Sequence, residues 1–227
     1  MLSPLDLRKV NVFRDLPVSQ LELIYELVSF RDYSAGEFIF TQGQPGDAVF
    51  FVTRGRVKIS VTATDGREKI MHVMSVGQVF GEVVLFDAGS YPASAQAMEA
   101  AQVGVLKNQD LFDLLRQHTE LAINLLRLLA RRLRMAQRQV QDLALKDAYE
   151  RVVQLIVDLA ETKGCKEANG SIHLDLDLTR EEMAKLTGTT RETFTRMLAE
   201  LRQAGLLAVR RNQVLIPSLA RLREIID

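Results

Sequence analysis

The pattern of hydrophobic and polar positions changes its period along the chain. Between about residues 36 and 107 the two kinds of residue alternate in short runs, as in VKISVT at 57–62. Nine of the 13 glycines lie in this segment, most of them about ten residues apart, which is the spacing of short strands joined by turns. The pair Asp65-Gly66 separates two such runs and predicts a hairpin with a type I′ turn, which needs positive φ angles. We therefore predict an antiparallel β-roll here, with a short helix before it within residues 17–30.

A helical period replaces this alternation from Gln109 onward. No glycine or proline occurs between Leu106 and Lys163. Along residues 126–143, apolar residues follow one another at alternating intervals of three and four, which is the period of a coiled-coil seam. We predict a long helix that pairs with the same helix of a second chain; the alternative is a helix packed on its own domain. The predicted dimer interface consists of Leu126, Leu129, Leu133, Ala136, Val140 and Leu143.

Five arginines occupy the other faces of this helix, and no acidic residue lies between positions 127 and 138. Five charged side chains without partners cannot be buried in a protein core, which favours self-pairing through the apolar seam. The alternative is a solvated face whose side-chain stems cover apolar surface. These residues are Arg127, Arg131, Arg132, Arg134 and Arg138.

A third pattern begins near residue 146, where a new helix starts that ends near Gly164. The next stretch, residues 163–171, is polar and contains glycine, so we expect a loop that holds the single cysteine, Cys165. Apolar residues then alternate with polar ones over residues 172–178, as in a half-buried strand.

Residues 178–207 read LTREEMAKLTGTTRETFTRMLAELRQAGLL, which predicts two helices joined by a sharp turn. Thr179 and Glu182 form a capping box, so a helix begins directly after Thr179. Ala184 allows close helix packing, and Gly188 can take the positive φ of the turn. This is the pattern of a helix-turn-helix, which places its second helix in the major groove of DNA. That second helix starts after Thr189 or Thr190 and buries Phe194, Met197, Leu198 and Leu201.

The exposed face of the second helix is expected to carry four polar side chains close together. Arginine can donate two hydrogen bonds to guanine, glutamate can accept one from cytosine, and threonine can contact thymine. The alternative is a plain surface helix with an ion pair between Glu192 and Arg196, which contributes about 0.2–0.5 kcal/mol. Between residues 179 and 223 nine arginines and lysines stand against four acids, a balance that suits phosphate contact. The patch consists of Arg191, Glu192, Thr195 and Arg196, and a predicted hairpin wing with Arg210 and Arg211 at its tip follows.

Composition narrows the class of protein further. Hydrophobic residues make up 47% of the chain, charged residues 26%, and the net charge is zero, which excludes a disordered protein. A single cysteine excludes a disulfide framework and an iron–sulfur cluster held by four cysteines. No apolar run of about 18 residues is present to span a membrane, and the N-terminal segment does not read as a signal peptide. We expect a cytoplasmic protein without membrane contact.

Three motifs, in their order and spacing, resemble the cyclic-AMP receptor / fumarate-nitrate regulator (CRP/FNR) superfamily of bacterial transcription factors. They are FGEVVLF at 80–86, ARRL at 130–133 and TRETFTR at 190–196, and the resemblance covers about residues 10–225. It implies an α+β fold with an N-terminal antiparallel β-roll (a jelly roll of the cyclic-nucleotide-binding type), a long dimerisation helix and a C-terminal winged helix-turn-helix. The implied domains are a sensory roll at 1–108, the dimerisation helix and hinge at 109–146, and the DNA-binding domain at 147–227.

The resemblance also implies partners and DNA-binding residues. Such proteins are homodimers that bind a palindromic DNA operator, contact RNA polymerase and respond to a small-molecule effector in the roll. Arg191, Glu192 and Arg196 would read half-sites of TGTGA or TTGA type that lie about 34 Å apart, and Arg180 would contact phosphate. The predicted DNA-binding set is Arg180, Thr190, Arg191, Glu192, Thr195 and Arg196.

Cyclic AMP is disfavoured as the effector. The family's phosphate-binding segment begins with Gly-Glu, here Gly81 and Glu82, and ends in Arg-Ser, whose positions hold Pro92 and Ala93 in this chain. A buried phosphate without a cation is costly. Two hydroxyl residues that meet adenine in the family are also replaced. The predicted effector pocket consists of Met71, Met74, Gly81, Glu82, Val83, Pro92, Ala93, Arg132, Ala136 and Gln137.

Other effectors and functions stay open. Haem, bound through His72, is one alternative, and the stretches at 89–97 and 144–160 resemble the nitric-oxide-responsive branch of the family. A second alternative is a small organic or acidic effector, and a third is that the roll binds no effector. The single thiol of Cys165 gives only a weak hypothesis of a redox switch. No Ser/His/Asp arrangement, metal-ligand cluster or phosphate-binding GxxxxGK[ST] loop is present, so we expect no enzyme. Another possible function is that of a cyclic-nucleotide-binding module that regulates a protein partner. The helix-turn-helix argues against it, because such a module would not need a base-reading patch.

Overall fold

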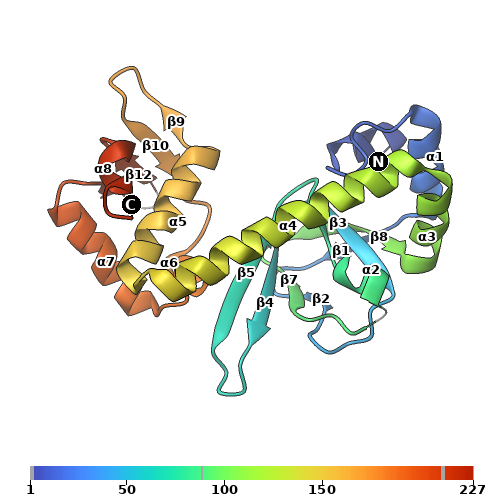
Figure 1. The fold of residues 1–227 in the computed structure, drawn as a ribbon, viewed down its shortest axis with the longest axis horizontal. Coiled ribbons are helices and arrows are strands. Elements are labelled where there is room, and N and C mark those ends of the chain that lie inside the picture. Colours follow the sequence, from blue (N-terminus) through green and yellow to red (C-terminus); the bar gives the residue numbers. More distant parts are fainter. Residues whose placement is uncertain (1–2, 88, 211–212, 227) are drawn as a thin grey trace. The chain divides into compact units, whose positions relative to one another are not determined.

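The structure, a computed structural model, describes residues 3–87, 89–210 and 213–226. The chain forms two compact units, Met1–Arg134 and Met135–Asp227. The first unit is rich in strands and the second in helices (Figure 1). One long helix, α4 (Thr119–Leu145), begins in the first unit and ends in the second.

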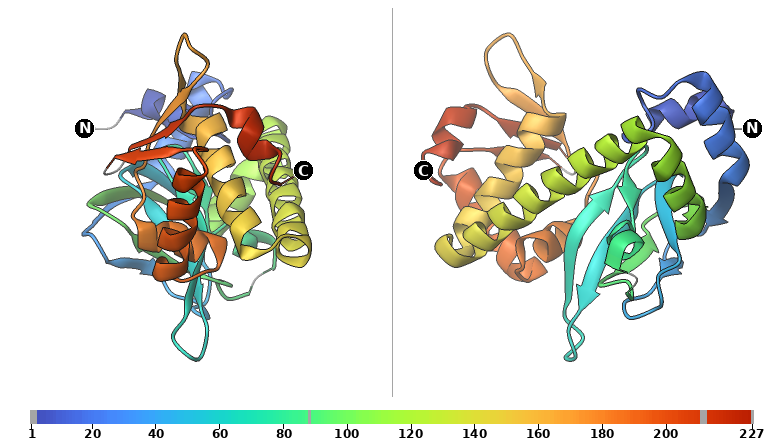
Figure 2. Two further views of the ribbon diagram at one scale, coloured as in Figure 1. Left: turned by 90° about the vertical axis from the view of Figure 1, so that its left-hand side faces the viewer. Right: turned by 45° about the vertical axis from the view of Figure 1, so that its right-hand side comes forward.

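The first unit is built on two four-stranded antiparallel sheets, which confirms the predicted β-roll. The sheets have the strand orders β1-β8-β3-β6 and β2-β7-β4-β5, and the β4–β5 hairpin projects from the second sheet (Figure 2). The roll begins at Ser29, earlier than predicted, because the polar run SFRDY of β1 shows no clean alternation. The strands are β1 (Ser29–Tyr33), β2 (Phe38–Phe40), β3 (Ala48–Arg54), β4 (Val57–Thr62), β5 (Glu68–Met74), β6 (Val79–Phe80), β7 (Ser94–Ala97) and β8 (Ala101–Lys107).

Neighbouring residues of β3 belong to two different cores. Phe50 packs between the two sheets, whereas Phe51 points to the other face of its sheet and meets Leu21 of α1 and Leu111 of α3 in one cluster. Successive side chains of a strand point to opposite faces, so helices must cover the outer face of this sheet. The helices of this unit, besides α4, are the 3-10 helix η1 (Pro4–Lys9), α1 (Val18–Leu27), α2 (Val83–Asp87) and α3 (Asn108–Gln117).

Two local predictions for this unit are wrong. The predicted hairpin between β4 and β5 is confirmed, but its loop is not a two-residue type I′ turn. The Ala63 N–H donates to the Arg67 carbonyl at 2.9 Å, and this hydrogen bond encloses three residues. Gly66 does take a positive φ of 85°. The helical segment after Gln109 also breaks at His118, whose φ of −128° and ψ of 89° are not helical. No glycine or proline marks this break in the sequence.

The second unit packs helices on a small antiparallel sheet of order β11-β12-β10-β9. Cys165 lies in β9 and pairs with His173, so the prediction of a plain loop there is wrong, and β10 ends at Asp175, before the predicted end of the strand. The elements are α5 (Ala148–Lys163), β9 (Cys165–Lys166), β10 (Ile172–Asp175), α6 (Arg180–Thr187), α7 (Arg191–Gln203), β11 (Ala208–Arg210), β12 (Gln213–Ile216) and α8 (Leu219–Arg223). Within the described ranges, every helix is too short or too polar to cross a membrane.

Candidate functional site

The helix-turn-helix begins with the predicted capping box. The Thr179 hydroxyl accepts a hydrogen bond from the Glu182 N–H at 3.2 Å, and the Glu182 carboxylate accepts one from the Thr179 N–H at 2.7 Å. Helix α6 ends at Thr187, and Gly188 follows with φ 70° and ψ 38° in the left-handed region. A residue with a side chain rarely takes this conformation, so Gly188 is what allows the chain to turn sharply here.

The second helix is capped by Thr190, which decides between the two predicted caps. Its hydroxyl accepts a hydrogen bond from the Thr193 N–H at 3.2 Å. The Thr189 N–H is used differently, because it donates to the Ala184 carbonyl at 2.9 Å and closes the end of α6. Helix α7 therefore begins at Arg191, three residues after the glycine.

Helix α7 has one buried face and one exposed face. Phe194, Leu198 and Leu201 belong to the core of the unit, and Phe194 and Leu201 are fully buried. This burial fixes the rotation of the helix about its axis. The opposite face carries the four predicted side chains Arg191, Glu192, Thr195 and Arg196, all of them exposed.

The hydrogen bonds and ion pairs of this exposed face leave the Arg196 side chain available to bind a ligand. Thr195 donates its hydroxyl proton to the Arg191 carbonyl at 2.7 Å. Arg196 pairs with Glu200, with 3.8 Å between Nε and Oε1, and its side chain is 69% exposed. An exposed pair of this kind contributes about 0–1 kcal/mol, so Arg196 can leave Glu200 for a ligand at little cost.

The other predicted DNA-binding residues surround this face. Arg180 is partly buried at the first position of α6, and Thr190 is exposed at the cap of α7. The predicted wing is the β11–β12 hairpin, in which Arg210 is exposed. Arg211 lies outside the described residues.

The predicted effector pocket contains a buried ion pair. Glu82, at the start of α2, is 1% exposed. Arg132 of α4 donates from Nη1 to its Oε1 and from Nη2 to the Val79 carbonyl. Glu82 Oε2 has no hydrogen-bond partner among the described residues. The ion pair joins the roll to the middle of α4, through two residues that lie 50 positions apart in the chain.

The other residues of the predicted pocket differ in burial and are divided between the two units. Met74 packs in the core between the sheets, and Met71 is partly buried on the same strand. Val83 is 50% exposed, so it does not line an interior cavity. Pro92, between α2 and β7, is exposed, and Ala93 beside it is partly buried. Ala136 and Gln137 are exposed and belong to the second unit.

Sequence reasoning missed Tyr91, the residue before Pro92. Its ring is 2% exposed and stacks on Phe40, with 3.8 Å between the ring centroids. Its hydroxyl donates to the Ala48 carbonyl at 2.9 Å, and burial raises the pKa of this hydroxyl. Tyr91 thus fills the space between the two sheets. The sequence does contain one signal for this burial, because Tyr91 is an aromatic residue inside a polar, glycine-containing run.

His72, the candidate haem ligand, lies on β5 opposite Ile59 of β4. Burial lowers the pKa of its imidazole, and the positive charge of Arg132 lowers it further, so the ring is neutral at pH 7. No group of three or more His, Cys, Asp and Glu residues in the described parts of the chain has a geometry that could hold a metal ion.

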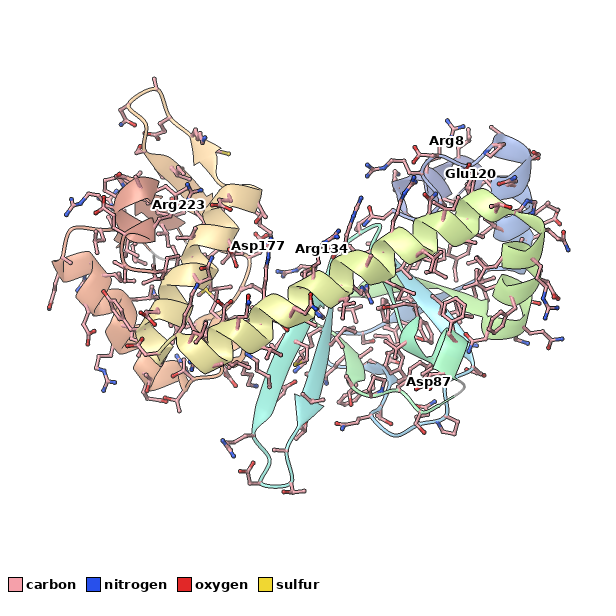
Figure 3. The ribbon with its side chains drawn as sticks, in the orientation of Figure 1. Arg8, Asp87, Glu120, Arg134, Asp177 and Arg223 are labelled. Carbon is pink, nitrogen blue, oxygen red and sulfur yellow. The ribbon has the colours of Figure 1, made fainter. Side chains whose placement is uncertain are left out.

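The predicted dimer seam on α4 is largely exposed. Leu126 and Leu133 are each 62% exposed, and Val140 and Leu143 are 66% and 57% exposed. Ala136 is also exposed, whereas Leu129 is partly buried. The outer arginines include Arg134, the last residue of the first unit, whose side chain is labelled in Figure 3.

A β-roll followed by a long helix and a winged helix-turn-helix defines a DNA-binding transcription regulator with an effector-binding domain. Comparison with known families agrees: residues 30–118 match the cyclic nucleotide-binding domain, and residues 150–225 match the Crp-like helix-turn-helix domain. The chain belongs to the CRP/FNR family of transcription regulators.

Several relatives are similar over nearly their full length. The chain is 32% identical to the CRP-like cAMP-activated global transcriptional regulator of Mycobacterium tuberculosis, covering 95% of this chain and 96% of that protein. It is 32% identical to the cyclic AMP receptor protein of Thermus thermophilus, covering 94% and 95%. The solved structure of FixK2 from Bradyrhizobium japonicum has a TM-score of 0.76 at 25% identity, covering 88% of this chain and 98% of that one.

Proposed function

We propose that two copies of this chain form a homodimer that reads a palindromic DNA operator, under the control of an effector other than cyclic AMP. The observation that carries this proposal is the two-faced helix α7. Its apolar face is buried, and Arg191, Glu192, Thr195 and Arg196 are exposed together on the other.

The chemistry of this patch suits the edges of G·C pairs. Arg191 and Arg196 can each donate two hydrogen bonds to a guanine, and Glu192 can accept one from a cytosine. Arg180 and Thr190 stand at the starts of α6 and α7, where backbone N–H groups and the helix dipole also favour phosphate. Family membership adds RNA polymerase as a proposed protein partner.

The exposed seam of α4 supports the dimer. Four apolar side chains that are more than half exposed on one helix face are costly in water, at about 25 cal/mol for each Å² of apolar surface. Their 3.5-residue period matches a parallel partner helix of the same sequence. We therefore assign residues 109–146 to dimerisation, between a sensory domain at 1–108 and a DNA-binding domain at 147–227.

The two positions that hold Arg-Ser in the family's phosphate-binding segment offer nothing that would bind a cyclic phosphate here. Pro92 and Ala93 supply neither a cation nor a hydroxyl, and Arg132 is already paired with the buried Glu82. An unpaired phosphodiester would have to be desolvated without compensation. Since residues 30–118 match the cyclic nucleotide-binding domain and two of the similar proteins are named for cyclic AMP, a cyclic-nucleotide effector is the second candidate.

Replacement of a base-reading arginine should remove operator selectivity. Arg196→Ala should weaken binding to a TTGA-type palindrome by about 5- to 150-fold, because a bidentate arginine–guanine contact contributes about 1–3 kcal/mol. Fluorescence anisotropy with operator and scrambled duplexes measures this. Arg202→Ala, at an exposed position in the last turn of the same helix, is the control and should bind normally. Unchanged affinity of the Arg196 variant would remove the base-reading role.

A charge placed in the seam should separate the subunits. Leu133→Glu should give a monomer in sedimentation velocity, because the pairing of two seams would bury two carboxylates without partners. Arg134→Glu changes the charge at the next position, outside the seam, and should remain dimeric. A Leu133→Glu protein that sediments as a dimer would contradict pairing through this helix.

Cyclic AMP should not stabilise the wild-type protein. A ligand at a concentration of 100 Kd adds about 2.7 kcal/mol of stability, which gives a clear rise in Tm. Millimolar cyclic AMP should leave Tm unchanged in differential scanning fluorimetry, whereas Pro92→Arg/Ala93→Ser, which restores a cation and a hydroxyl, should respond. A rise of several degrees in the wild type would favour the cyclic-nucleotide candidate.

A further inference from the structure

We propose that Arg151 is a positioning residue, which ties the end of α4 to the turn of the helix-turn-helix and so sets the orientation of α7. This inference rests on the proposed DNA-binding role of α7 and deepens it, because it names the contact through which α4 controls that helix. All the groups involved lie in the second unit, Met135–Asp227.

The link between α4 and α5 is a short, fully bonded corner. Only Lys146 and Asp147 separate the two helices. The Lys146 N–H continues α4 by donating to the Asp142 carbonyl at 3.0 Å. Asp147 caps α5, since its carboxylate accepts from the N–H groups of Tyr149 and Glu150 at 2.8 and 2.9 Å. A corner with its polar groups satisfied in this way is stiff.

Arg151 joins this corner to the DNA-binding motif. Its Nη1 donates to the Lys146 carbonyl at 2.8 Å, and its Nε donates to the Thr187 carbonyl at 3.1 Å. Lys146 follows the last residue of α4, and Thr187 is the last residue of α6. Carbonyls at helix C-termini lack intrahelical partners and carry the negative end of the helix dipole. One guanidinium therefore caps two helices at once.

The side chain of Lys146 strengthens the α4 side of this junction. Its Nζ lies 3.1 Å from Asp142 Oδ1 on α4 and donates to Gln154 Oε1 on α5 at 2.6 Å. Gln154 in turn donates to the Asp158 carboxylate at 2.8 Å. The Lys146 backbone, to which Arg151 binds, is thus fixed to both helices.

The α6 side of the junction lies directly before the turn. Thr187 is followed by Gly188, whose left-handed conformation reverses the chain, and Thr190 then caps α7. The guanidinium is planar and rigid, so a displacement of the α4 end moves the Thr187 carbonyl with it. Arg151 thereby couples the direction of α4 to the placement of the base-reading patch.

The test replaces Arg151 in the full-length protein and measures binding to the palindromic operator. Arg151→Lys keeps the charge and the stem, but an ammonium group cannot reach both carbonyls in one geometry. We expect operator affinity to fall about tenfold, with the slope of log affinity against log salt unchanged, because no phosphate contact is lost. Arg151→Gln should show the same effect more strongly.

The control is Arg223→Gln, which removes a different arginine contact to α5. Arg223 of α8, labelled in Figure 3, pairs with Glu161 of α5 and not with a residue of the helix-turn-helix. This variant should bind the operator as the wild type does. Hydrogen exchange gives a second readout: the peptide that contains residues 186–190 should exchange faster in the Arg151 variants and not in the control.

A folded Arg151→Lys protein with wild-type operator affinity would overturn the proposal. So would a slope of log affinity against log salt that is reduced by about one, because that change marks a lost phosphate contact. Unchanged hydrogen exchange at residues 186–190 in the Arg151 variants would also overturn it. Arg151→Lys decides the question if Arg151→Gln does not fold. Failure of the proposed function looks different, because the wild type would then not prefer the palindrome and Arg196→Ala would change nothing.

Discussion

The burial of Phe194 and its neighbours is the interaction on which the DNA-binding unit depends. An amphipathic helix turns its apolar face to the core, and in α7 this leaves Arg191, Glu192, Thr195 and Arg196 exposed on the other side. Packing of the core thereby exposes the proposed base-reading patch on the opposite face of the helix. Gly188 and the Thr190 cap then set where along the chain the helix starts.

The apolar face of α4 must also be removed from water, but the core of its own chain does not bury it. Its apolar seam is not covered within one chain, since Leu126, Leu133, Val140 and Leu143 are each more than half exposed. A second copy would cover this seam and would present the reading patch twice. The ion pair between the buried Glu82 and the partly buried Arg132 connects the middle of α4 to the roll. Arg151 connects Lys146, directly after α4, to the turn before α7. Polar contacts thus link α4 to the roll at its middle and, through Lys146, to the helix-turn-helix at its end.

Local sequence signals predicted the elements that depend on local physics. The Thr179–Glu182 capping box, the glycine turn at Gly188 and the alternating strands of the roll follow from neighbouring residues alone, and the structure confirms them. Family resemblance supplied the order of domains, which the matches at 30–118 and 150–225 agree with.

The sequence could not reveal features that depend on distant partners. The break at His118 carries no glycine or proline. The β9 strand exists only because β10 lies beside it. Tyr91 points into the core because its ring stacks on Phe40 and its hydroxyl donates to the Ala48 carbonyl. In the sequence, Arg151 looks like an ordinary charged residue on a helix surface. Its role depends on the Thr187 carbonyl, which lies 36 positions later in the chain and accepts its hydrogen bond.

Hydroxyl-radical footprinting tests the central claim most directly. The wild-type protein is bound to a duplex that it has selected from a random library, and the cleavage of both strands is read. Two identical reading helices on a two-fold axis predict two short protected stretches on one face of the duplex, about one helical turn apart. A single protected stretch, or two on opposite faces, would contradict the account.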